Sequence, residues 1–421
     1  MVQILILLVG LLLYAVYGSA GLAGLIWLLA AALIIWLAGL ALLRCRWLFW
    51  PLIVVSAAPL VLMRLQPVTG FSLLAPLGVS YFTLQMISYV VDVRKEKYPP
   101  EKSFLTFALY LTYFPHLIQG SIESFDHMKT ALAEQEFSWD GLSAGAIRMV
   151  WGAFKMLMIS VRASVVLATI SASPEEYCGA YALFAMILYS VRLYADFSGC
   201  MDIVLGVSQV LGLRLSENFD APYYSQTVAE FWRRWHMTLG TWLRNYIYIP
   251  LGGNRKGKLR KVINLIITFL VSGFWHGFHY ILWGLFNGIF VALGNGLRTK
   301  FKAFNRLLTF LIISVLWSFF IWPDTFTALG SIGSLFTTFN YGALAANILS
   351  LGLGAADWIV FLCATVLLWV YDGNKERFKN VFTGSAPAMR LAVVGALGLL
   401  ALVFGMYGIG FEAEQFIYSS F

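Results

Sequence analysis

His276 is the residue of this chain best placed to act as a base. It stands in the apolar stretch LVSGFWHGFHYILWGLFNG, residues 270–288, where His279 is the only other Asp, Glu, Lys, Arg or His side chain. From Phe231 to Pro323 the chain has no Asp or Glu but twelve Lys and Arg residues. Burying an imidazole in a sequence apolar enough for the membrane interior costs free energy, and membrane proteins usually accept that cost where function requires it. We therefore predict that His276 is a catalytic base and that any charged partner is an anion.

The residues around His276 predict a helix that can break. On a helix starting near Gly273, positions i, i+4, i+7 and i+11 share one face. These positions are His276, Tyr280, Trp283 and Asn287. We therefore predict that Tyr280, Trp283 and Asn287, together with Trp275, bind substrate beside the catalytic His276. Gly273 and Gly277 leave one turn without side chains, which permits close approach of another backbone and a break in the helix.

A second histidine lies in the segment 214–261, which is too polar to cross a membrane. Apolar side chains recur at helical spacing and predict one amphipathic helix, ended by Pro250 and the glycines after it. The apolar side chains at this spacing are Phe231, Trp235, Leu239, Trp242 and Tyr246. Arg233, Arg234 and Arg244 project away from that face. An interfacial helix with snorkelling arginines explains most of this pattern. His236, with open space at Gly240 one turn later, favours a second active-site imidazole instead.

Other interpretations of these residues stay open at this stage. A buried histidine can hydrogen-bond a neighbouring helix or relay protons in a transporter. A metal site at His276 and His279 lacks the third ligand that zinc requires, so we expect no metal. Asp196 and Asp202 in YADFSGCMD are candidate intramembrane carboxylates, for function or for helix–helix contact. His127 is expected to be solvated in a polar loop.

Composition places the chain in a membrane. Of its 421 residues 60% are hydrophobic and 12% charged, with a mean hydropathy of +0.78. A soluble protein of this length needs more charge, and strand-like alternation is missing, so the expected class is all-α. The expected spans number about 10–12, some of them re-entrant: 2–17, 20–43, 47–63, 71–91, 104–118, 142–171, 178–213, 262–297 (broken), 307–322, 328–353, 357–372 and 390–411. We see one membrane-embedded domain, 1–421.

Charge and cysteine placement add topology but no further site. The net charge of +8 concentrates in Arg94–Lys97, Arg255–Lys261, Arg298–Arg306 and Lys375–Lys379, which predicts cytoplasmic loops and no nucleic-acid partner. The four cysteines lack metal-ligand spacing and are expected to be small buried hydrophobes. The N-terminal apolar run lacks a basic region before it and is expected to be a retained first membrane helix.

Several motifs resemble those of the membrane-bound O-acyltransferase (MBOAT) superfamily. EFWRRWHMTLGTWLRNYIYIPLGGNRKG is followed, forty residues after its histidine, by SGFWHG. FPHLIQGSI (114–122) is similar to a motif of the bacterial branch with alginate O-acetyltransferases and teichoic acid D-alanyltransferases, with Ser121 where proline is usual. The DFSG segment has Cys200 in place of the common tyrosine, and QFIYSSF resembles the acetyltransferase C-terminus. The resemblance is densest over residues 75–290.

The resemblance implies a ring of helices around a central funnel, with short re-entrant and interfacial helices. It implies that His276 is catalytic and that His236 is the second active-site position. IPLGGNRKG favours acetyl transfer over D-alanyl transfer from a carrier-protein thioester. The implied setting is a multi-pass protein of the bacterial cytoplasmic (inner) membrane that modifies a cell-surface polysaccharide. The implied partner is an SGNH-hydrolase-like or other membrane-anchored acyl-relay protein.

Together these observations predict a mechanism. A buried imidazole favours its neutral form, so His276 removes the proton of a hydroxyl that attacks a thioester carbonyl, a step worth about 10²–10⁴-fold. His236, with Asn287 or a backbone N–H, orients substrate or stabilises the oxyanion. Arg233, Arg234, Arg244 and the 255–261 cluster attract an anionic donor, acetyl-CoA or an acyl carrier protein, or else bind membrane lipid headgroups. The donor is a co-substrate, and we expect no bound cofactor.

Overall fold

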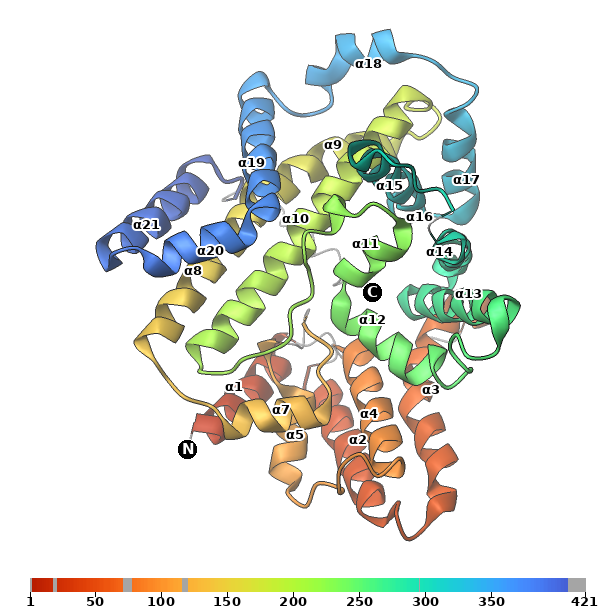
Figure 1. Ribbon diagram of the computed structural model, residues 1–421, viewed down its shortest axis with the longest axis vertical. Helices are drawn as coiled ribbons and strands as arrows, with labels where there is room; N and C mark the ends of the chain where they lie inside the picture. The colour runs from red at the N-terminus through yellow and green to blue at the C-terminus, as the bar shows by residue number, and fades with distance from the viewer. Residues whose placement is uncertain (1, 18–20, 71–77, 116–119, 295, 408–421) are drawn as a thin grey trace.

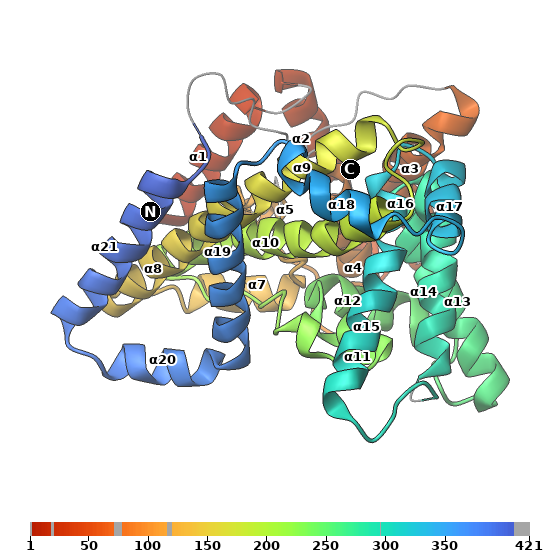
Figure 2. The same cartoon turned by 90° about the horizontal axis from the view of Figure 1, so that it is seen from above.

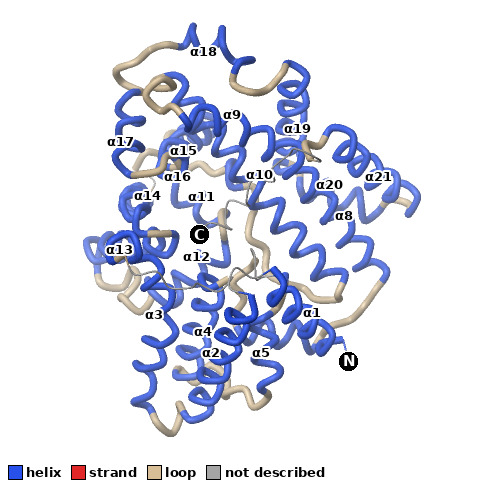
Figure 3. The backbone as a smooth tube through the Cα atoms, turned by 180° about the vertical axis from the view of Figure 1, so that it is seen from behind, coloured by secondary structure: helices blue, strands red, loops and turns tan. Residues whose placement is uncertain are grey.

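The chain folds into helices that the sequence pattern largely anticipates. The computed structural model describes residues 2–17, 21–70, 78–115, 120–294 and 296–407. Within these residues the elements are helices and turns, and the one extended pairing is an isolated bridge between Phe219 and Trp235. Figure 3 shows helices and loops throughout the described chain. The expected all-α class is confirmed.

The N-terminal helices pack together on one side of the molecule, in the lower part of Figure 1. They share an aromatic-rich core that includes Tyr14, Phe82, Tyr89 and Phe107. Their bounds are α1 Val2–Tyr17, α2 Gly21–Ala41, α3 Phe49–Thr69 after a short turn at Arg46–Leu48, α4 Val79–Arg94 and α5 Phe104–Thr112. The expected spans 71–91 and 104–118 fall partly outside the described residues.

Two long helices cross the middle of the molecule and pack through glycines. After α7 (Phe125–Ala133), α8 (Trp139–Lys155) runs through a π-turn at Met156–Ser160 into α9 (Val161–Ala172), and α10 (Ala180–Val210) packs against α8. A Cβ at Gly152 would lie 2.4 Å from the Gly199 carbonyl oxygen. Only glycine permits this approach, which is how helices associate where lipid removes the hydrophobic driving force.

The polar segment and the WHG motif form the centre. Figure 1 shows α11 and α12 in the middle of the view, encircled by the longer helices. The elements are a turn at Pro222–Tyr224, α11 Val228–Arg234, α12 Met237–Leu243, a π-turn at Arg244–Tyr248, α13 Gly257–His276, a short turn at Phe278–Tyr280 and α14 Ile281–Leu293. The expected break in span 262–297 is confirmed at Gly277.

The C-terminal helices complete the ring on the opposite side. They are α15 Lys302–Leu316, α16 Ser318–Ile321, α17 Thr325–Ser334, α18 Tyr341–Asn347, a turn at Ile348–Ser350, α19 Ala355–Gly373, α20 Lys375–Gly384 and α21 Pro387–Phe404. The expected span 328–353 is wrong, since it forms the short helices α17 and α18 with a break at 335–340. Its glycines and the Thr337-Thr338-Phe339-Asn340 run favour turns over one helix. The C-terminal motif QFIYSSF lies outside the described residues.

Helix lengths support several membrane crossings. Within the described ranges six helical segments are long and apolar enough to cross a membrane, and three shorter apolar helices accompany them. Figure 2 places the N-terminal end of α13, the connection into α15, and α20 near one edge of the molecule. The basic clusters at 255–261, 298–306 and 375–379 therefore lie on one side, as the positive-inside tendency requires of cytoplasmic loops.

Candidate active site

His236 occupies a break between two helices. The expected single helix over this segment is wrong, because α11 ends at Arg234, Trp235 is extended, and His236 has a left-handed backbone with φ 45° and ψ 55°. Thr227 starts α11 by accepting a hydrogen bond from the Glu230 amide (3.1 Å). A left-handed backbone is strained for a residue with a Cβ, and such strain tends to persist at functional sites.

His276 is the last residue of α13. Gly277 ends that helix, so the expected shared helical face of His276, Tyr280, Trp283 and Asn287 is wrong. Instead α13 and α14 form a hairpin that folds Trp283 back onto the histidine, with ring centroids 5.4 Å apart. The hairpin depends on glycine, because a Cβ at Gly273 would lie 2.4 Å from the Tyr280 carbonyl oxygen. The predicted close approach of a backbone at Gly273 is confirmed.

The two imidazoles line one small cavity of about 50 Å³. Its walls come from α11, α12, α13, α14 and Trp317, which follows α15. The lining residues are Trp232, Trp235, His236, Leu239, Gly240, Leu243, Phe269, Ser272, His276, Trp283 and Trp317. Four indoles and no carboxylate surround the histidines in this part of the described structure, so the cavity is apolar apart from the imidazoles and Ser272.

Both histidines are buried, His236 with 2% and His276 with 5% of their surface exposed. Trp275 packs between them, its ring 4.7 Å from that of His276 and 6.3 Å from that of His236. Burial lowers the pKa of His236 to about 3, since desolvation disfavours the charged ring. His236 is therefore neutral at pH 7, as a group that accepts a proton or hydrogen bond must be.

Three other side chains predicted to bind substrate, Trp275, Tyr280 and Asn287, lie behind the cavity wall and do not line the cavity. Trp275 donates to the Ser80 carbonyl (3.1 Å) and does not line the cavity. Asn287 is fully buried, accepts from the Trp232 indole (3.0 Å) and donates to the Trp283 carbonyl (2.9 Å). Tyr280 stacks on Phe320 at 4.1 Å between ring centroids. Asn287 therefore contacts Trp232 and Trp283, which form part of the cavity wall, and not the cavity itself.

Sequence reasoning missed Arg64, a buried residue of α3. Its Nε donates to the carbonyl of Trp275 (2.7 Å) and an Nη donates to Ser80 Oγ (2.9 Å). Arg64 therefore holds the C-terminal end of α13 next to His276, where helix carbonyls lack intrahelical partners. The one signal in the sequence is an arginine inside an otherwise apolar span.

The three arginine candidates do not converge. Arg233 and Arg244 are exposed. Arg234 pairs with Glu230 (2.9 Å) and lines a second, polar cavity of about 470 Å³. That cavity mixes acidic and basic side chains, namely Asp220, Glu230, Asp372 and Glu376 with Arg234, Arg306, Lys375 and Arg377. Helix α11 sends Trp232 to the small cavity and Arg234 to the large one, so its last turn separates the two.

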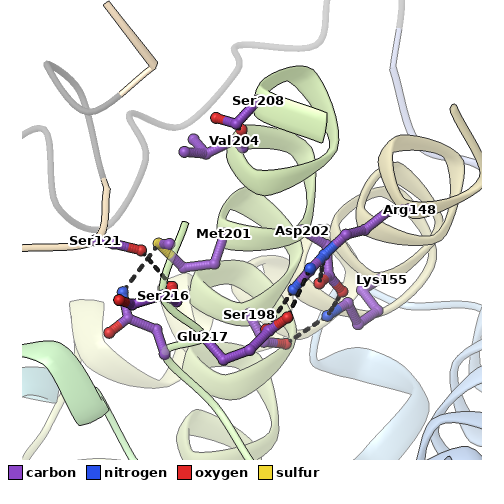
Figure 4. A network of polar contacts seen from close by, with 11 residues as sticks. Ser121, Arg148, Lys155, Ser198, Met201, Asp202, Val204, Ser208, Ser216 and Glu217 are labelled. Carbon is purple, nitrogen blue, oxygen red and sulfur yellow. Dashed lines mark hydrogen bonds and ion pairs between the residues drawn. The ribbon is translucent and has the colours of Figure 1, made fainter. Parts of the chain in front are cut away.

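Asp196 and Asp202 lie on α10 away from the small cavity. Asp196 accepts a hydrogen bond from Ser160 Oγ (3.2 Å). Asp202 accepts from Lys155 (2.7 Å) and Arg148 (2.9 Å), and Lys155 also donates to Ser198 Oγ (2.8 Å). Figure 4 shows these side chains joining α8 to α10. The network satisfies buried charges between two packed helices, which is a structural role for Asp202.

The FPHLIQGSI segment leads into a buried carboxylate. Ser121, at the usual proline position, donates to the Ser216 carbonyl (2.7 Å), a bond that proline cannot make (Figure 4). Glu123 accepts from the Ser216 amide (2.7 Å) and pairs with His127. His127 lies on α7 rather than in the expected loop, and its side chain is exposed, as expected, while it pairs with Glu123. His116 lies outside the described residues.

The hydrogen bond to Glu123 raises the pKa of His127 above its ordinary value. A raised pKa means that the pair stabilises the fold at pH values below the unfolded value of about 6.5. That contribution disappears as the pH rises through the raised pKa. The His127 side chain is 45% exposed, so solvent screening keeps it below about 1 kcal/mol.

Two buried imidazoles from separate motifs thus share one site, which indoles enclose, in a polytopic α-helical membrane protein. No group of three or more His, Cys, Asp or Glu side chains within the described residues could hold a metal ion. Residues 99–338, more than half of the chain, match the membrane-bound O-acyltransferase family, MBOAT. The chain belongs to this family, and it is a multi-pass membrane protein.

The relatives that this chain is similar to are named as O-acetylating or D-alanyl-transferring proteins. The chain is 34% identical over 331 residues to a probable alginate O-acetylase of Pseudomonas syringae pv. tomato, covering 77% of this chain and 64% of that protein. It is 32% identical to a peptidoglycan O-acetyltransferase of Helicobacter pylori (59% and 54% covered). It is 28% identical to a teichoic acid D-alanyltransferase of Streptococcus thermophilus (62% and 67% covered). The chain thus spans less than two thirds of the first relative's length.

Proposed function

We propose that this O-acyltransferase moves an acetyl group from a cytoplasmic thioester donor, acetyl-CoA, across the bacterial inner membrane for O-acetylation of a cell-surface polysaccharide. The observation that carries the proposal is the single cavity shared by His236 and His276. Two motifs forty residues apart bring two buried imidazoles to a space of about 50 Å³, the scale of an acetyl group and a few solvent-sized atoms.

The reaction follows from the chemistry of the cavity. An acceptor hydroxyl loses its proton to His276 as its oxygen attacks the thioester carbonyl carbon. The tetrahedral intermediate collapses with cleavage of the carbon–sulfur bond, and the thiolate takes the proton back from the imidazolium. General base catalysis of this kind is worth about 10²–10⁴-fold. The indole walls exclude water, which limits hydrolysis of the thioester and strengthens each polar contact in the site.

The lining of the cavity favours acetyl over D-alanyl. A D-alanyl group carries an ammonium, and burying an ammonium requires a paired carboxylate or a full set of acceptors. Among the described residues that line the cavity there is no Asp or Glu. An acetyl group requires only apolar contact with its methyl group, and the indoles and leucines of the cavity supply that contact.

The large polar cavity offers a place for the anionic end of the donor. Arg234, Arg306, Lys375 and Arg377 contribute positive charge there, and α11 leads from it to the histidines. Arg306 lies over the Tyr224 ring (5.1 Å) and donates to the Tyr224 carbonyl (3.2 Å), so its guanidinium is held in place. Arginine so held suits phosphate recognition. On the outer side, we expect a membrane-anchored acyl-relay protein or the polysaccharide itself to collect the acetyl group.

The test is transfer of label from acetyl-CoA carrying a radioactive acetyl group. Membranes with the native chain and its membrane-anchored relay partner are compared with His276→Ala and His279→Ala membranes at equal protein level. His279 is exposed, three residues from His276, and serves as the matched control. We expect label in polymer or relay protein with the native chain and His279→Ala, and none with His276→Ala. Label delivered only from a D-alanyl carrier-protein thioester would overturn the acetyl assignment, and equal label from His276→Ala would overturn the base.

A further inference from the structure

Asn218, a buried residue of the connection after α10, contacts the His236 ring. It is 1% exposed, and its side-chain oxygen accepts hydrogen bonds from the Thr238 amide (3.1 Å) and the Thr238 hydroxyl (2.7 Å). A backbone amide can only donate. The atom that faces it is therefore the oxygen of the Asn218 amide and not its nitrogen, so this side chain has one orientation. Its nitrogen accordingly faces the Met201 sulfur (3.4 Å).

The same oxygen lies 3.3 Å from Nδ1 of His236. Because an amide oxygen can only accept, Nδ1 must carry the proton of the neutral ring. Nε2 then bears the lone pair, and it has no hydrogen-bond partner among the described residues. A ring that lines the small cavity thus keeps its accepting nitrogen unused.

The backbone around Asn218 fixes the histidine in the same way. Met237 donates to the Asn218 carbonyl (3.0 Å), and the Asp220 amide donates to the Arg234 carbonyl (3.0 Å). These bonds pair the stretch 218–220 antiparallel to 234–237 and hold His236 in its left-handed conformation. His236 is the N-cap of α12 but makes no side-chain cap bond, and Asn218 supplies that bond from outside the helix.

We propose that Asn218 is a positioning residue that holds His236 in the Nδ1–H tautomer, so that Nε2 meets the acyl acceptor as a hydrogen-bond acceptor. The inference rests on the proposed function and deepens it. A sugar offers several hydroxyls, so one can donate to His236 while the reacting one gives its proton to His276. In this tautomer His236 cannot donate through Nε2 to an oxyanion, which removes one of the two roles expected from the sequence.

The kinetic test compares three variants. Asn218→Leu removes the oxygen, Asn218→Asp keeps an oxygen that can accept all three bonds, and Asn305→Leu is the matched control. Asn305 is equally buried, and its oxygen accepts from the Thr299 amide (2.8 Å) and hydroxyl (2.9 Å), with no histidine among its recorded partners. We expect Asn218→Leu to lower kcat about tenfold or more with the KM for donor unchanged, and Asn218→Asp and Asn305→Leu to retain most of kcat. An equal loss in both leucine variants, or no rescue by aspartate, would overturn the proposal.

A spectroscopic test does not depend on turnover. With ¹⁵N-histidine labelling and assignment by a His236→Gln variant, nitrogen NMR reports which ring nitrogen is protonated. We expect a protonated Nδ1 and a bare Nε2 in the native protein, and loss of that preference in Asn218→Leu. A protonated Nε2 in the native protein would refute the tautomer assignment. Since this readout needs no acyl transfer, failure of the proposed function leaves the tautomer result intact and distinguishable.

Discussion

Gly240 lies on α12 one turn after His236 and lines the small cavity without a side chain. A Cβ added there would meet only the Trp232 carbonyl oxygen, at 3.6 Å, which is ordinary contact. Gly240→Ala should therefore fold well and gain up to about 1 kcal/mol, since alanine favours a helix interior over glycine. Gly240→Leu places four carbons at a cavity of about 50 Å³, which has room for roughly four water molecules.

The leucine should displace the acyl group by an ångström or more. Misplacement of that size costs about 10²-fold in rate, or about 2.7 kcal/mol of transition-state stabilisation. The assay is initial-rate transfer from labelled acetyl-CoA by detergent-purified protein, with thermal stability measured on the same samples. Gly330→Leu is the control, because Gly330 is an exposed helical glycine of α17 with open space around it. A folded Gly240→Leu enzyme at native rate would refute the placement of the acyl group in this cavity.

Three further predictions concern the support of the site and the fold. Lys155→Met should destabilise the protein by about 3–5 kcal/mol in thermal unfolding, because Asp202 loses one of its two cationic partners between α8 and α10. The double variant Lys155→Met/Asp202→Leu should recover part of that loss. His127→Gln should remove the fall in melting temperature that the native protein shows as pH rises above about 6.5, since the bond to Glu123 raises the pKa of His127. Arg64→Lys should lower the acetyl-transfer rate about tenfold without unfolding the chain, because lysine cannot make both guanidinium bonds, and a native rate would show that the end of α13 is held by other contacts.

The sequence predicts the class, the helical break and the two histidines because each leaves a local signal. An imidazole in an apolar run, a glycine beside it and an aromatic repeat at helical spacing can all be read over a few residues. Because these signals come from a few neighbouring residues, they give no information on contacts with distant parts of the chain, and the wrong predictions arise there. Helical spacing joins Phe231 to Tyr246 in one helix, but bonds from 218–220 break that helix at Trp235. These partners are more than ten residues away and follow no periodic pattern.

Residues that act by tertiary contact were beyond sequence reasoning. Arg64 and Asn218 each contact an element near a histidine from a distant part of the chain. A shared helical face predicts Asn287 beside His276, but the hairpin instead gives Asn287 the Trp232 indole as partner. Arg233, Arg234 and Arg244 are close in sequence, yet of these three Arg234 alone lines one of the two cavities described above. Near a helix end, the direction of a side chain depends on where the helix breaks.

The central claim is that His236 and His276 act together in one cavity. Its most direct test is a double-mutant cycle on the acetyl-transfer rate with His236→Ala, His276→Ala and the double variant, each checked for folding. Residues that serve one catalytic unit show strongly non-additive losses. We expect the double variant to be about as slow as the slower single variant. Losses that multiply, or a His236→Ala enzyme with native rate, would contradict the account.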